Sequence, residues 1–353
     1  KVPDMLRVAT PFKEGIAGID RSAFGMKYNT NKYGISLHLS NPKAQEVDRR
    51  LVKWADIVTD SMTPGTMKRW GLDYESVRKL KPDIIYYSTT QAGQHGPYAR
   101  FGAYGQEGAA VAGFYNLFGW PDQPPSPPYT AYTDFITPWT LIATLIGALA
   151  YRRKTGRGMY LEHSQWEAAM HFLGPALLDC KVNGRVLGRM GNADPYAAPH
   201  AAYRCQGPDR WVAIAVRHDA EWKAFCRAIG APQWTHEPRF ATLPGRKENE
   251  DELNKLVEDW TAGYTAEEVM WIMQNAGVPA GVVQNGQDLF EDPQIKGRGH
   301  FQWLPHKVIG MASHEMPAYR LSKTPSGSPR QGQPSAKITS MCTRRSWATQ
   351  TRT

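Results

Sequence analysis

One acid, Asp134, stands among residue types that make a carboxylate costly. It lies in the stretch YTAYTDFITPWT, residues 129 to 140, just before a long apolar run. A carboxylate in apolar surroundings has a desolvation cost, and the positive end of a following helix returns only about 0.3 to 1 kcal/mol. Pro138 favours a helix that begins beside it, with Thr137 as N-cap. Asp134 therefore need not be the cap, and two interpretations stay open: a capping or Asx-turn acid and a catalytic group.

Other stretches carry weaker chemical signals. The glycine-rich run HGPYARFGAYGQEG, residues 95 to 108, follows a predicted strand, where phosphates often bind, but an ordinary loop has the same composition. The basic residues of GLDYESVRKLKPD could contact a phosphate or simply form a solvated helix face. His95 and His200 lie in predicted loops and could be catalytic, although the ten histidines form no paired metal-ligand pattern.

Composition narrows the class of protein. The formal charge of +9 belongs to the end of the chain: seven of the 42 Lys and Arg residues lie from Arg320 onward, where there is no acid, which leaves 35 basic against 33 acidic residues. Charge therefore gives no reason to expect a nucleic-acid partner. The apolar run from Leu141 to Tyr151 is short for a bilayer, so we expect a buried core helix and no membrane partner. Four scattered cysteines indicate a reducing, cytoplasmic setting and no metal site.

The elements that must position Asp134 alternate between strand and helix. We expect strands at 34–39, 57–59 and 84–88, separated by a helix at 41–56 and two helices between Pro64 and Pro82. Helices are expected at 106–118, 138–154 and 163–180, the last two joined by a connection and strand at GRGMYLE. Strands alternating with helices indicate an α/β fold with a parallel, Rossmann-like sheet.

The pattern changes after Gly191. AAYRCQGPDRWVAIAV reads as two antiparallel strands joined at a turn, followed by helices near 219–229, 250–260 and 265–276 and a strand at AGVVQ. We therefore expect a large Rossmann-like domain over 1–199, a smaller α+β domain over 200–300 and a return to the large domain over 301–325.

Several motifs occur in the order of one known family. NKYGISLHLSNPKAQEVDRRLVKWADIVTDSMTPGTMKRWGL, then PDIIYYSTTQAGQHGPYA, ALAYRRKTGRG and GN with AP together resemble the family III CoA-transferases, the CaiB/BaiF or formyl-CoA transferase group. The resemblance covers about residues 1 to 325. It implies two chains threaded through each other as linked rings, a homodimer or a heterodimer with a homologue, that act on an acyl-CoA and a free carboxylic acid.

The resemblance also implies residue roles. Asp134 aligns with the family's catalytic aspartate, and Arg69 falls where the family has an arginine that contacts CoA. Ser61 and Met62 fall where the CoA site is lined, with Ser61 in place of a common asparagine. Leu37 matches a nucleotide-lining position, and Ser40 replaces a frequent lysine. Coenzyme A is expected as a substrate, with no metal.

Two further positions separate the alternatives within the family. Racemases of this family have a histidine where this chain has Tyr104, and a tyrosine with a reference pKa of about 10 is a poor carbon-acid base near neutral pH. The next position, commonly Asp or Glu, is Gly105, so that Gln106 or Glu107 would have to replace that acid. We therefore expect a CoA-transferase, with an acyl-CoA racemase or lyase and a non-catalytic scaffold subunit as the alternatives.

Both ends depart from the family pattern. The resemblance leads us to expect about forty further residues, the first βα unit, before Lys1. The basic tail over 326–353 lacks hydrophobic periodicity, and a reading one nucleotide earlier could encode a family-like LGEDNEYVY and ILGYSD. The hypotheses are a frameshift near 326–334 or a disordered tail, which the nucleotide sequence would distinguish.

Overall fold

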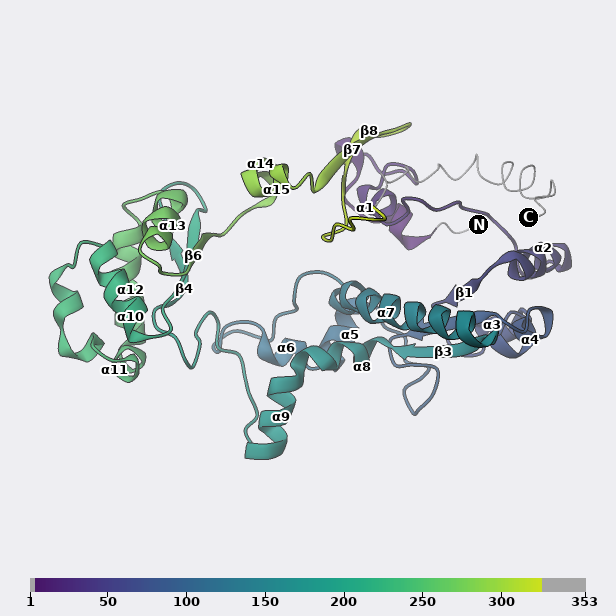
Figure 1. The fold of residues 1–353 in the computed structure, drawn as a ribbon, viewed down its shortest axis with the longest axis horizontal. Helices are drawn as coiled ribbons and strands as arrows, with labels where there is room; N and C mark the ends of the chain where they lie inside the picture. The colour runs from purple at the N-terminus through teal and green to yellow at the C-terminus, as the bar shows by residue number, and fades with distance from the viewer. Residues whose placement is uncertain (1–3, 326–353) are drawn as a thin grey trace. The chain divides into compact units, whose positions relative to one another are not determined.

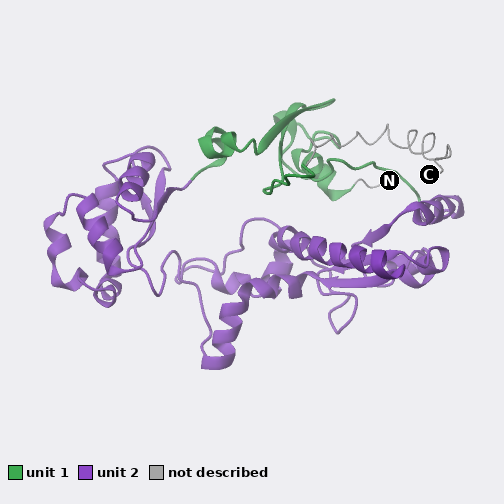
Figure 2. Ribbon diagram, in the orientation of Figure 1, with its two compact units in different colours: residues 1–38, 284–353 green, residues 39–283 purple. Residues whose placement is uncertain are grey.

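The computed structural model describes residues 4–325 (Figure 1). The chain forms two compact units, which are described separately: unit 1 comprises Lys1–His38 and Gln284–Thr353, and unit 2 comprises Leu39–Val283 (Figure 2). The domain borders expected near 199 and 300 stay a prediction. The frameshift hypothesis falls on 326–353, outside the described residues.

A three-stranded parallel sheet organises the first part of unit 2. Its strands are β1 (Ile57–Asp60), β2 (Ile85–Thr90) and β3 (Met159–Ser164), in the order β1-β2-β3. The β-branched and aromatic residues of IVT and IIYYST favour strands, and parallel pairing requires crossovers between them. The crossover from β1 to β2 contains α3 (Thr66–Arg69) and α4 (Tyr74–Leu80), and α2 (Pro42–Trp54) precedes β1. The expected α/β class with a parallel sheet is confirmed.

The crossover from β2 to β3 carries the longest helix of the described chain. Before it come α5 (Gly105–Val111) and α6 (Phe114–Leu117), and then α7 spans Tyr132–Thr155 and ends at Gly156 in the left-handed conformation. After β3 follow α8 (Gln165–Met170), a 3-10 turn (His171–Leu173) and α9 (Gly174–Asn183). Helices α5, α7 and α8 share one small core with Phe114 and Ile136, which fixes the start of α7 against α5.

An antiparallel sheet forms the rest of unit 2, as the GPD turn predicted. Its strands are β4 (His200–Arg204), β5 (Trp211–Ala215) and β6 (Ala280–Val282). Its helices are α10 (Asp219–Ala228), α11 (Leu243–Glu248), α12 (Glu250–Thr261) and α13 (Ala266–Asn275), with 3-10 turns at Gln233–His236 and Pro238–Phe240. Arg246 is fully buried in its core, where Nε donates to Ala198 O at 2.8 Å and the guanidinium lies over the Trp222 ring.

Unit 1 combines both ends of the chain. It contains 3-10 turns at Met5–Val8 and Lys13–Gly15, helices α1 (Ala23–Lys27), α14 (Gly286–Glu291) and α15 (Pro293–Gly297), and the hairpin of β7 (Phe301–His306) and β8 (Gly310–Glu315). The side chains of Lys27 and Glu315 form an ion pair at 2.6 Å between segments 288 residues apart.

Four expectations about the elements are corrected. Residues 34–39 form no strand, because no described strand pairs with them and β1 is an edge of its sheet. Helix α7 begins at Tyr132 instead of beside Pro138, so Thr137 is not its N-cap and Asp134 lies in its first turn. The helix expected at 106–118 breaks at Gly113, whose φ of 97° is left-handed. The expected helix at 163–180 is a strand end followed by two helices and a 3-10 turn.

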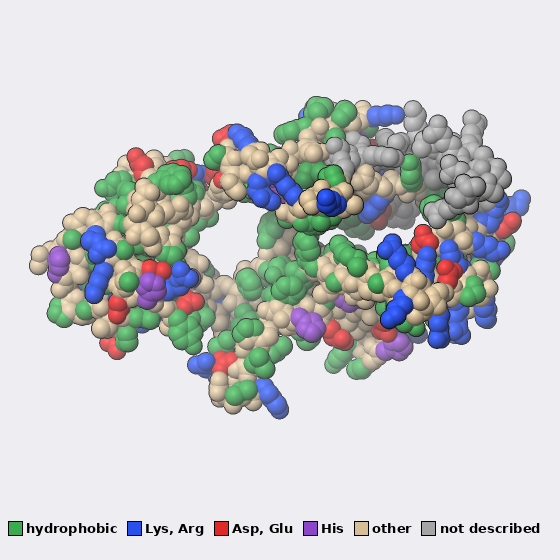
Figure 3. Space-filling model, in the orientation of Figure 1, with side chains coloured by type: hydrophobic (Ala, Val, Ile, Leu, Met, Phe, Trp, Pro, Cys, Tyr) green, Lys and Arg blue, Asp and Glu red, His purple; other side chains and the backbone are tan. Residues whose placement is uncertain are grey.

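The early start also changes how α7 should be understood. Pro138 lies inside the helix, where it cannot donate to the carbonyl of Asp134 four residues earlier. The longer helix is apolar and long enough to cross a membrane by length and composition alone, which is weak evidence, since core helices pass the same test. Only 17% of its most apolar 18-residue segment is buried within the chain, and the side chains of Trp139, Ile142 and Ile146 are exposed. The expected buried core helix is therefore wrong for a single chain. Figure 3 shows apolar side chains gathered along this helix.

Candidate functional site

Asp134 lies where the carboxyl ends of β2 and β3 meet the start of α7. Gln91 directly follows β2 and Gln165 directly follows β3, and both contact the acid. Gln91 Nε2 donates to Asp134 Oδ1 at 3.4 Å and to Gln165 Oε1 at 2.7 Å. Because adjacent parallel strands end at the same edge of a sheet, residues 74 apart in sequence converge on one carboxylate.

Burial and hydrogen bonding act on this carboxylate in opposite directions. Burial of the carboxyl group raises the pKa of Asp134 above its ordinary value, although the residue keeps an exposed side. Hydrogen bonds from Gln165, the Gly105 backbone amide and Gln91 favour the ionised form and lower the pKa, but by less than burial raises it. All three donors are neutral groups, so these hydrogen bonds do not neutralise the negative charge of the carboxylate. The carboxylate of Asp134 is therefore more basic than a free one.

Gly105 allows the start of α7 to approach α5. A Cβ on residue 105 would lie 2.8 Å from the backbone carbon and oxygen of Ala131. Thr133 Oγ1 closes the contact by donating to Gly105 O at 3.2 Å. The glycine is therefore needed for the geometry that brings its own amide to Asp134.

The neighbours of Gly105 do not supply a second acid to the site. Glu107 Oε2 accepts a hydrogen bond from the Tyr104 backbone N at 3.1 Å and so caps helix α5. Tyr104 itself is 70% exposed. The structure thus gives Glu107, considered above as a replacement for the missing acid, a capping contact.

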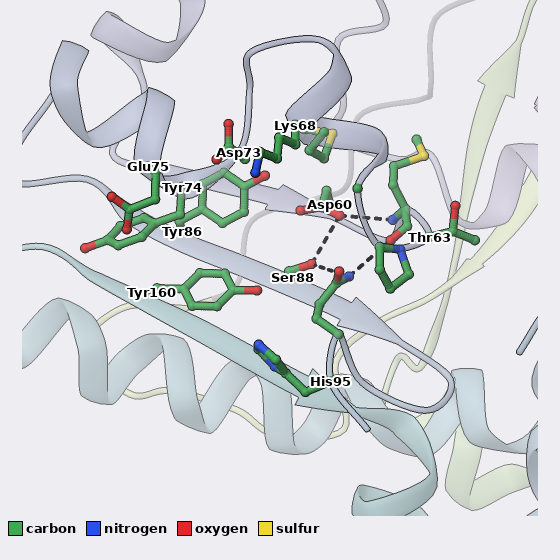
Figure 4. A pocket seen from close by; sticks show the side chains of 15 residues that line it. Asp60, Thr63, Lys68, Asp73, Tyr74, Glu75, Tyr86, Ser88, His95 and Tyr160 are labelled. Atoms are coloured by element: carbon green, nitrogen blue, oxygen red, sulfur yellow. Dashed lines mark hydrogen bonds between the residues drawn. The ribbon is translucent and has the colours of Figure 1, made fainter. Parts of the chain in front are cut away.

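A pocket of about 320 Å³ opens on one face of the same sheet (Figure 4). The strand register explains its lining, since residues paired across parallel strands point to the same face. Tyr86 of β2 is level with Tyr160 of β3, and Ser88 is level with Asp60 of β1. Tyr74 from α4 stacks on Tyr160 with ring centroids 5.4 Å apart. The pocket therefore has an aromatic floor.

The rim of the pocket is polar. Gln94 Nε2 donates to Ser88 Oγ at 2.9 Å and to Met62 O at 3.1 Å, and Ser88 Oγ donates to Asp60 Oδ1 at 3.2 Å. His95 Nδ1 lies 2.5 Å from Glu162 Oε2. Figure 4 shows Lys68 and Asp73 on one side of the tyrosine rings and His95 on the other.

One loop connects the pocket to Asp134. Gln91 contacts the acid and His95 lines the pocket, and a chain of four residues spans at most about 14 Å. The pocket and the carboxylate therefore lie at the two ends of one short loop.

The structure brings together only part of the predicted site. Met62 lines the pocket. Ser61 and Arg69 flank it without lining it, and Arg69 Nη2 instead donates to Thr66 Oγ1 at 2.9 Å. Gly105 contacts Asp134 through its backbone amide, and Tyr104 precedes it as the N-cap of α5; neither of the two lines the pocket. Leu37 lies in unit 1 and is described only within that unit, so its predicted role stays a prediction.

Several contacts were not predicted from the sequence. Lys68 lines the pocket beside the predicted Arg69, and its place on the short helix after PG was the available signal. No sequence signal distinguished Gln91 and Gln165, because amide side chains are common in loops. Of the two loop histidines, His95 lines the pocket, whereas His200 Nδ1 lies 2.6 Å from Asn192 O at the start of β4.

The arrangement suits attack by a carboxylate. Asp134 has neutral donors on one side and an exposed side open to a ligand. Among residues 4–325, no group of three or more His, Cys, Asp or Glu side chains is placed to hold a metal ion.

Comparisons with known proteins agree with one another. The sequence profile of CoA-transferase family III matches residues 1–336. The chain is 29% identical over 297 residues to the succinyl-CoA–D-citramalate CoA-transferase of Chloroflexus aurantiacus, covering 84% of this chain and 74% of the relative. It is 30% identical over 280 residues to the acetyl-CoA:oxalate CoA-transferase of Acetobacter aceti, covering 79% and 72%. The crystal structure of a CaiB/BaiF family protein from Brucella suis superimposes with a TM-score of 0.87 at 26% identity, covering 96% of this chain and 88% of the other.

Proposed function

This chain belongs to CoA-transferase family III and is a CoA-transferase, and from that premise we propose that it moves CoA from a dicarboxylic acyl-CoA to a free carboxylic acid through covalent intermediates on Asp134. The observation that carries the proposal is the position of Asp134, an ionisable acid held by three neutral donors at the end of the loop that lines the pocket.

The first half of the proposed reaction loads CoA onto the enzyme. A carboxylate oxygen of Asp134 attacks the thioester carbonyl carbon, the C–S bond breaks and CoA leaves as a thiolate, which gives a mixed anhydride. The thiolate then attacks Cγ of Asp134, the donor acid leaves as a carboxylate, and an aspartyl-CoA thioester remains. No net proton is transferred.

The second half runs the same steps in reverse. The acceptor carboxylate attacks Cγ of the aspartyl thioester and releases the thiolate, which then attacks the acceptor's acyl carbon and frees Asp134. Forming an anhydride from a thioester is uphill, because a carboxylate with a pKa near 4 displaces a thiolate with a pKa near 8.5. A raised pKa on Asp134 narrows this difference. Holding the thiolate beside the anhydride supplies an effective concentration of about 10⁵ M or more.

The alternatives explain less of the site. A racemase needs a base that removes a proton from carbon, and Tyr104 is a phenol that is 70% exposed. A scaffold subunit would not need three hydrogen bonds on a carboxylate with a raised pKa.

The substrate class is tested by an exchange panel. The names of the two relatives contain succinyl-CoA, citramalate and oxalate, whose acids are dicarboxylic, and one name also contains acetyl-CoA, whose acid is monocarboxylic. Full-length protein should be incubated with succinyl-, oxalyl- or acetyl-CoA and each free acid in turn, and new thioesters measured by mass spectrometry. We expect the fastest transfer for a pair of dicarboxylic acids. Faster transfer for monocarboxylic pairs would contradict the proposed substrate class, and no transfer with any pair would contradict the proposed function.

Lys68 gives a prediction about CoA binding. It is the one Lys or Arg among the described residues that line the pocket, and CoA carries phosphates. Lys68→Met should raise KM for the acyl-CoA about tenfold and leave kcat within about twofold, because the charge binds substrate and transition state equally. Steady-state kinetics measures both constants. Lys53→Met, at the exposed end of α2, is the matched control. A fall in kcat with unchanged KM would contradict this role.

The exposed face of α7 predicts an oligomer. Trp139, Ile142 and Ile146 are exposed on it, which is unusual for a soluble chain alone. We propose that a second copy covers this face, as the linked-ring dimer expected from the resemblance would do. Light scattering should give about 79 kDa, twice the 39.6 kDa of one chain. Ile146→Glu should lower that mass, and Lys223→Glu, on the exposed side of α10, should not. A monomeric parent protein would contradict the proposal.

A further inference from the structure

Gln91 has an amide group whose orientation is fixed on both sides. The side chain is 7% exposed. Its nitrogen faces two oxygen atoms, Gln165 Oε1 at 2.7 Å and Asp134 Oδ1 at 3.4 Å. Its oxygen lies 3.3 Å from Thr133 Oγ1, whose single proton is shared between this oxygen and Gly105 O. Reversing the amide would place its oxygen against two acceptors. The N–H is therefore directed at one particular oxygen of Asp134.

A missing side chain on α5 makes room for this amide. A Cβ on Gly108 would overlap Gln91 Oε1 and lie 2.8 Å from Thr133 Oγ1. Gly108 is buried in the middle of α5, where glycine costs about 0.5 to 1 kcal/mol relative to alanine. The Gln91 amide occupies the space that a side chain at 108 would fill, so the contacts of this amide offset the conformational cost of the glycine.

We propose that Gln91 is a positioning residue that selects the attacking oxygen of Asp134 and stabilises negative charge on the other. With Oδ1 held by Gln91, Oδ2 is the oxygen that bonds to the acyl carbon. When the CoA thiolate then attacks Cγ, the C=O electron pair moves onto Oδ1, the Cγ–Oδ2 bond breaks as the C=O re-forms, and the donor acid leaves with Oδ2. This inference rests on the proposed function, because it assigns a role within the aspartyl-CoA steps.

The expected contribution of Gln91 to kcat depends on the step at which negative charge develops on Asp134 Oδ1. In the resting enzyme the Gln91 bond is long, and a carboxylate shares its charge between two oxygens. During attack on Cγ the charge concentrates on Oδ1, so the bond should strengthen in the transition state more than in the ground state. Removing one donor from an oxyanion site can lower kcat about 10² to 10³-fold. Because Gln165 and the Gly105 amide also donate to this carboxyl group, we expect about 10 to 100-fold.

Two variants test the inference in the full-length protein. Gln91→Leu removes the amide at similar size, and Gly108→Ala keeps Gln91 but displaces its amide, which is the flexible end of a side chain and can move. Both should lower kcat about 10 to 100-fold, with KM for the acyl-CoA within about threefold. Both should also move the acid limb of kcat to higher pH, because the bond from Gln91 lowers the pKa of Asp134.

Matched controls separate this role from general damage. Gln274→Leu removes an amide that donates to Ala280 O at 2.8 Å, and Gly286→Ala adds a methyl where nothing lies within 4 Å. Both should behave as the parent protein.

The outcomes distinguish this inference from the proposed function. Acyl-CoA followed by hydroxylamine should label Asp134 in the parent protein and label it more slowly in both variants. A labelled parent with unchanged kcat and pH profile in folded Gln91→Leu, or in Gly108→Ala should the leucine variant not fold, would overturn this inference alone. A parent that transfers CoA without labelling Asp134 would overturn the proposed function and the inference with it.

Discussion

Replacing Asp134 with asparagine is expected to lower kcat for CoA transfer by at least about 10⁴-fold, equivalent to about 5.5 kcal/mol of transition-state stabilisation. Asparagine keeps the size of the side chain and can still hydrogen bond to Gln91 and Gln165, but its amide oxygen is a poor nucleophile. Binding of CoA, measured by calorimetry, should stay within about threefold, because the pocket is lined by other residues.

The same substitution should stabilise the folded protein. Burial raises the pKa of Asp134 in the folded state above the ordinary value of 3.8. Between the unfolded and the folded pKa the native state holds more protons, so stability falls as pH rises through that window and the cost persists above it. Asp134→Asn should therefore raise Tm at pH 7, and the difference should vanish at pH 3, where the parent carboxyl is neutral.

A matched acid provides the control for Asp134. Asp259 is exposed on α12, and Asp259→Asn should change neither activity nor Tm. Activity in Asp134→Asn within tenfold of the parent, after mass spectrometry excludes deamidation to aspartate, would contradict a nucleophilic role for Asp134.

Adding one methyl group at Gly105 is expected to have the second largest effect. A Cβ there would lie 2.8 Å from backbone atoms of Ala131, and backbone cannot turn aside as a side chain can. Gly105→Ala should lower the free energy of unfolding by about 1 to 3 kcal/mol. It should also lower kcat about 100-fold, since the start of α7 and the Gly105 amide would move away from each other. Denaturant unfolding and steady-state kinetics measure the two effects.

Gly102→Ala is the matched control for Gly105, because a methyl group at 102 meets nothing within 4 Å. It should leave stability and kcat near the parent values. Gly105→Glu, which restores an acid type common in the resembled family, should be less active than Gly105→Ala and not more. Full activity in Gly105→Ala, or a gain in Gly105→Glu, would contradict the close approach of α5 and α7 as the reason for this glycine.

Local sequence patterns predicted the parallel sheet well. Runs such as IIYYST carry strand propensity in consecutive residues, and Asn41 with Pro42 gives α2 a cap and a first turn that read directly from the sequence. The hairpin of β4 and β5 followed from alternating residues around a turn. In each case the determining residues are neighbours in sequence.

The wrong predictions of secondary structure concern segments whose conformation depends on residues distant in sequence. GISLHL has strand-like alternation, but a strand needs a hydrogen-bonding partner, and no described strand supplies one. Pro138 indicates a helix start by local rules, yet packing of Ile136 with Phe114 and Leu173 extends α7 past it. Tertiary contacts outweighed the local preference.

The catalytic role of Asp134 stays a prediction, and the residues that contact it were not predicted from the sequence. Asp134 could be singled out because an acid among apolar residues is unusual. Gln91, Gln165 and Gly108 could not, since they meet only when the ends of β2 and β3 and helix α5 are in place. In the sequence, Gly105 stands where the resembled family commonly has an acid. In the structure, the close approach of Ala131 leaves no room for a side chain at this position.

Chemical trapping on Asp134 determines directly whether this residue is the nucleophile. Full-length protein should be mixed with the acyl-CoA that it turns over fastest in the exchange panel, quenched with hydroxylamine and digested, and the peptide containing Asp134 analysed by mass spectrometry. We expect a hydroxamate on Asp134 in the parent, none without acyl-CoA and none at that position in Asp134→Asn. A protein that transfers CoA at full rate with Asp134 unmodified would contradict this expectation.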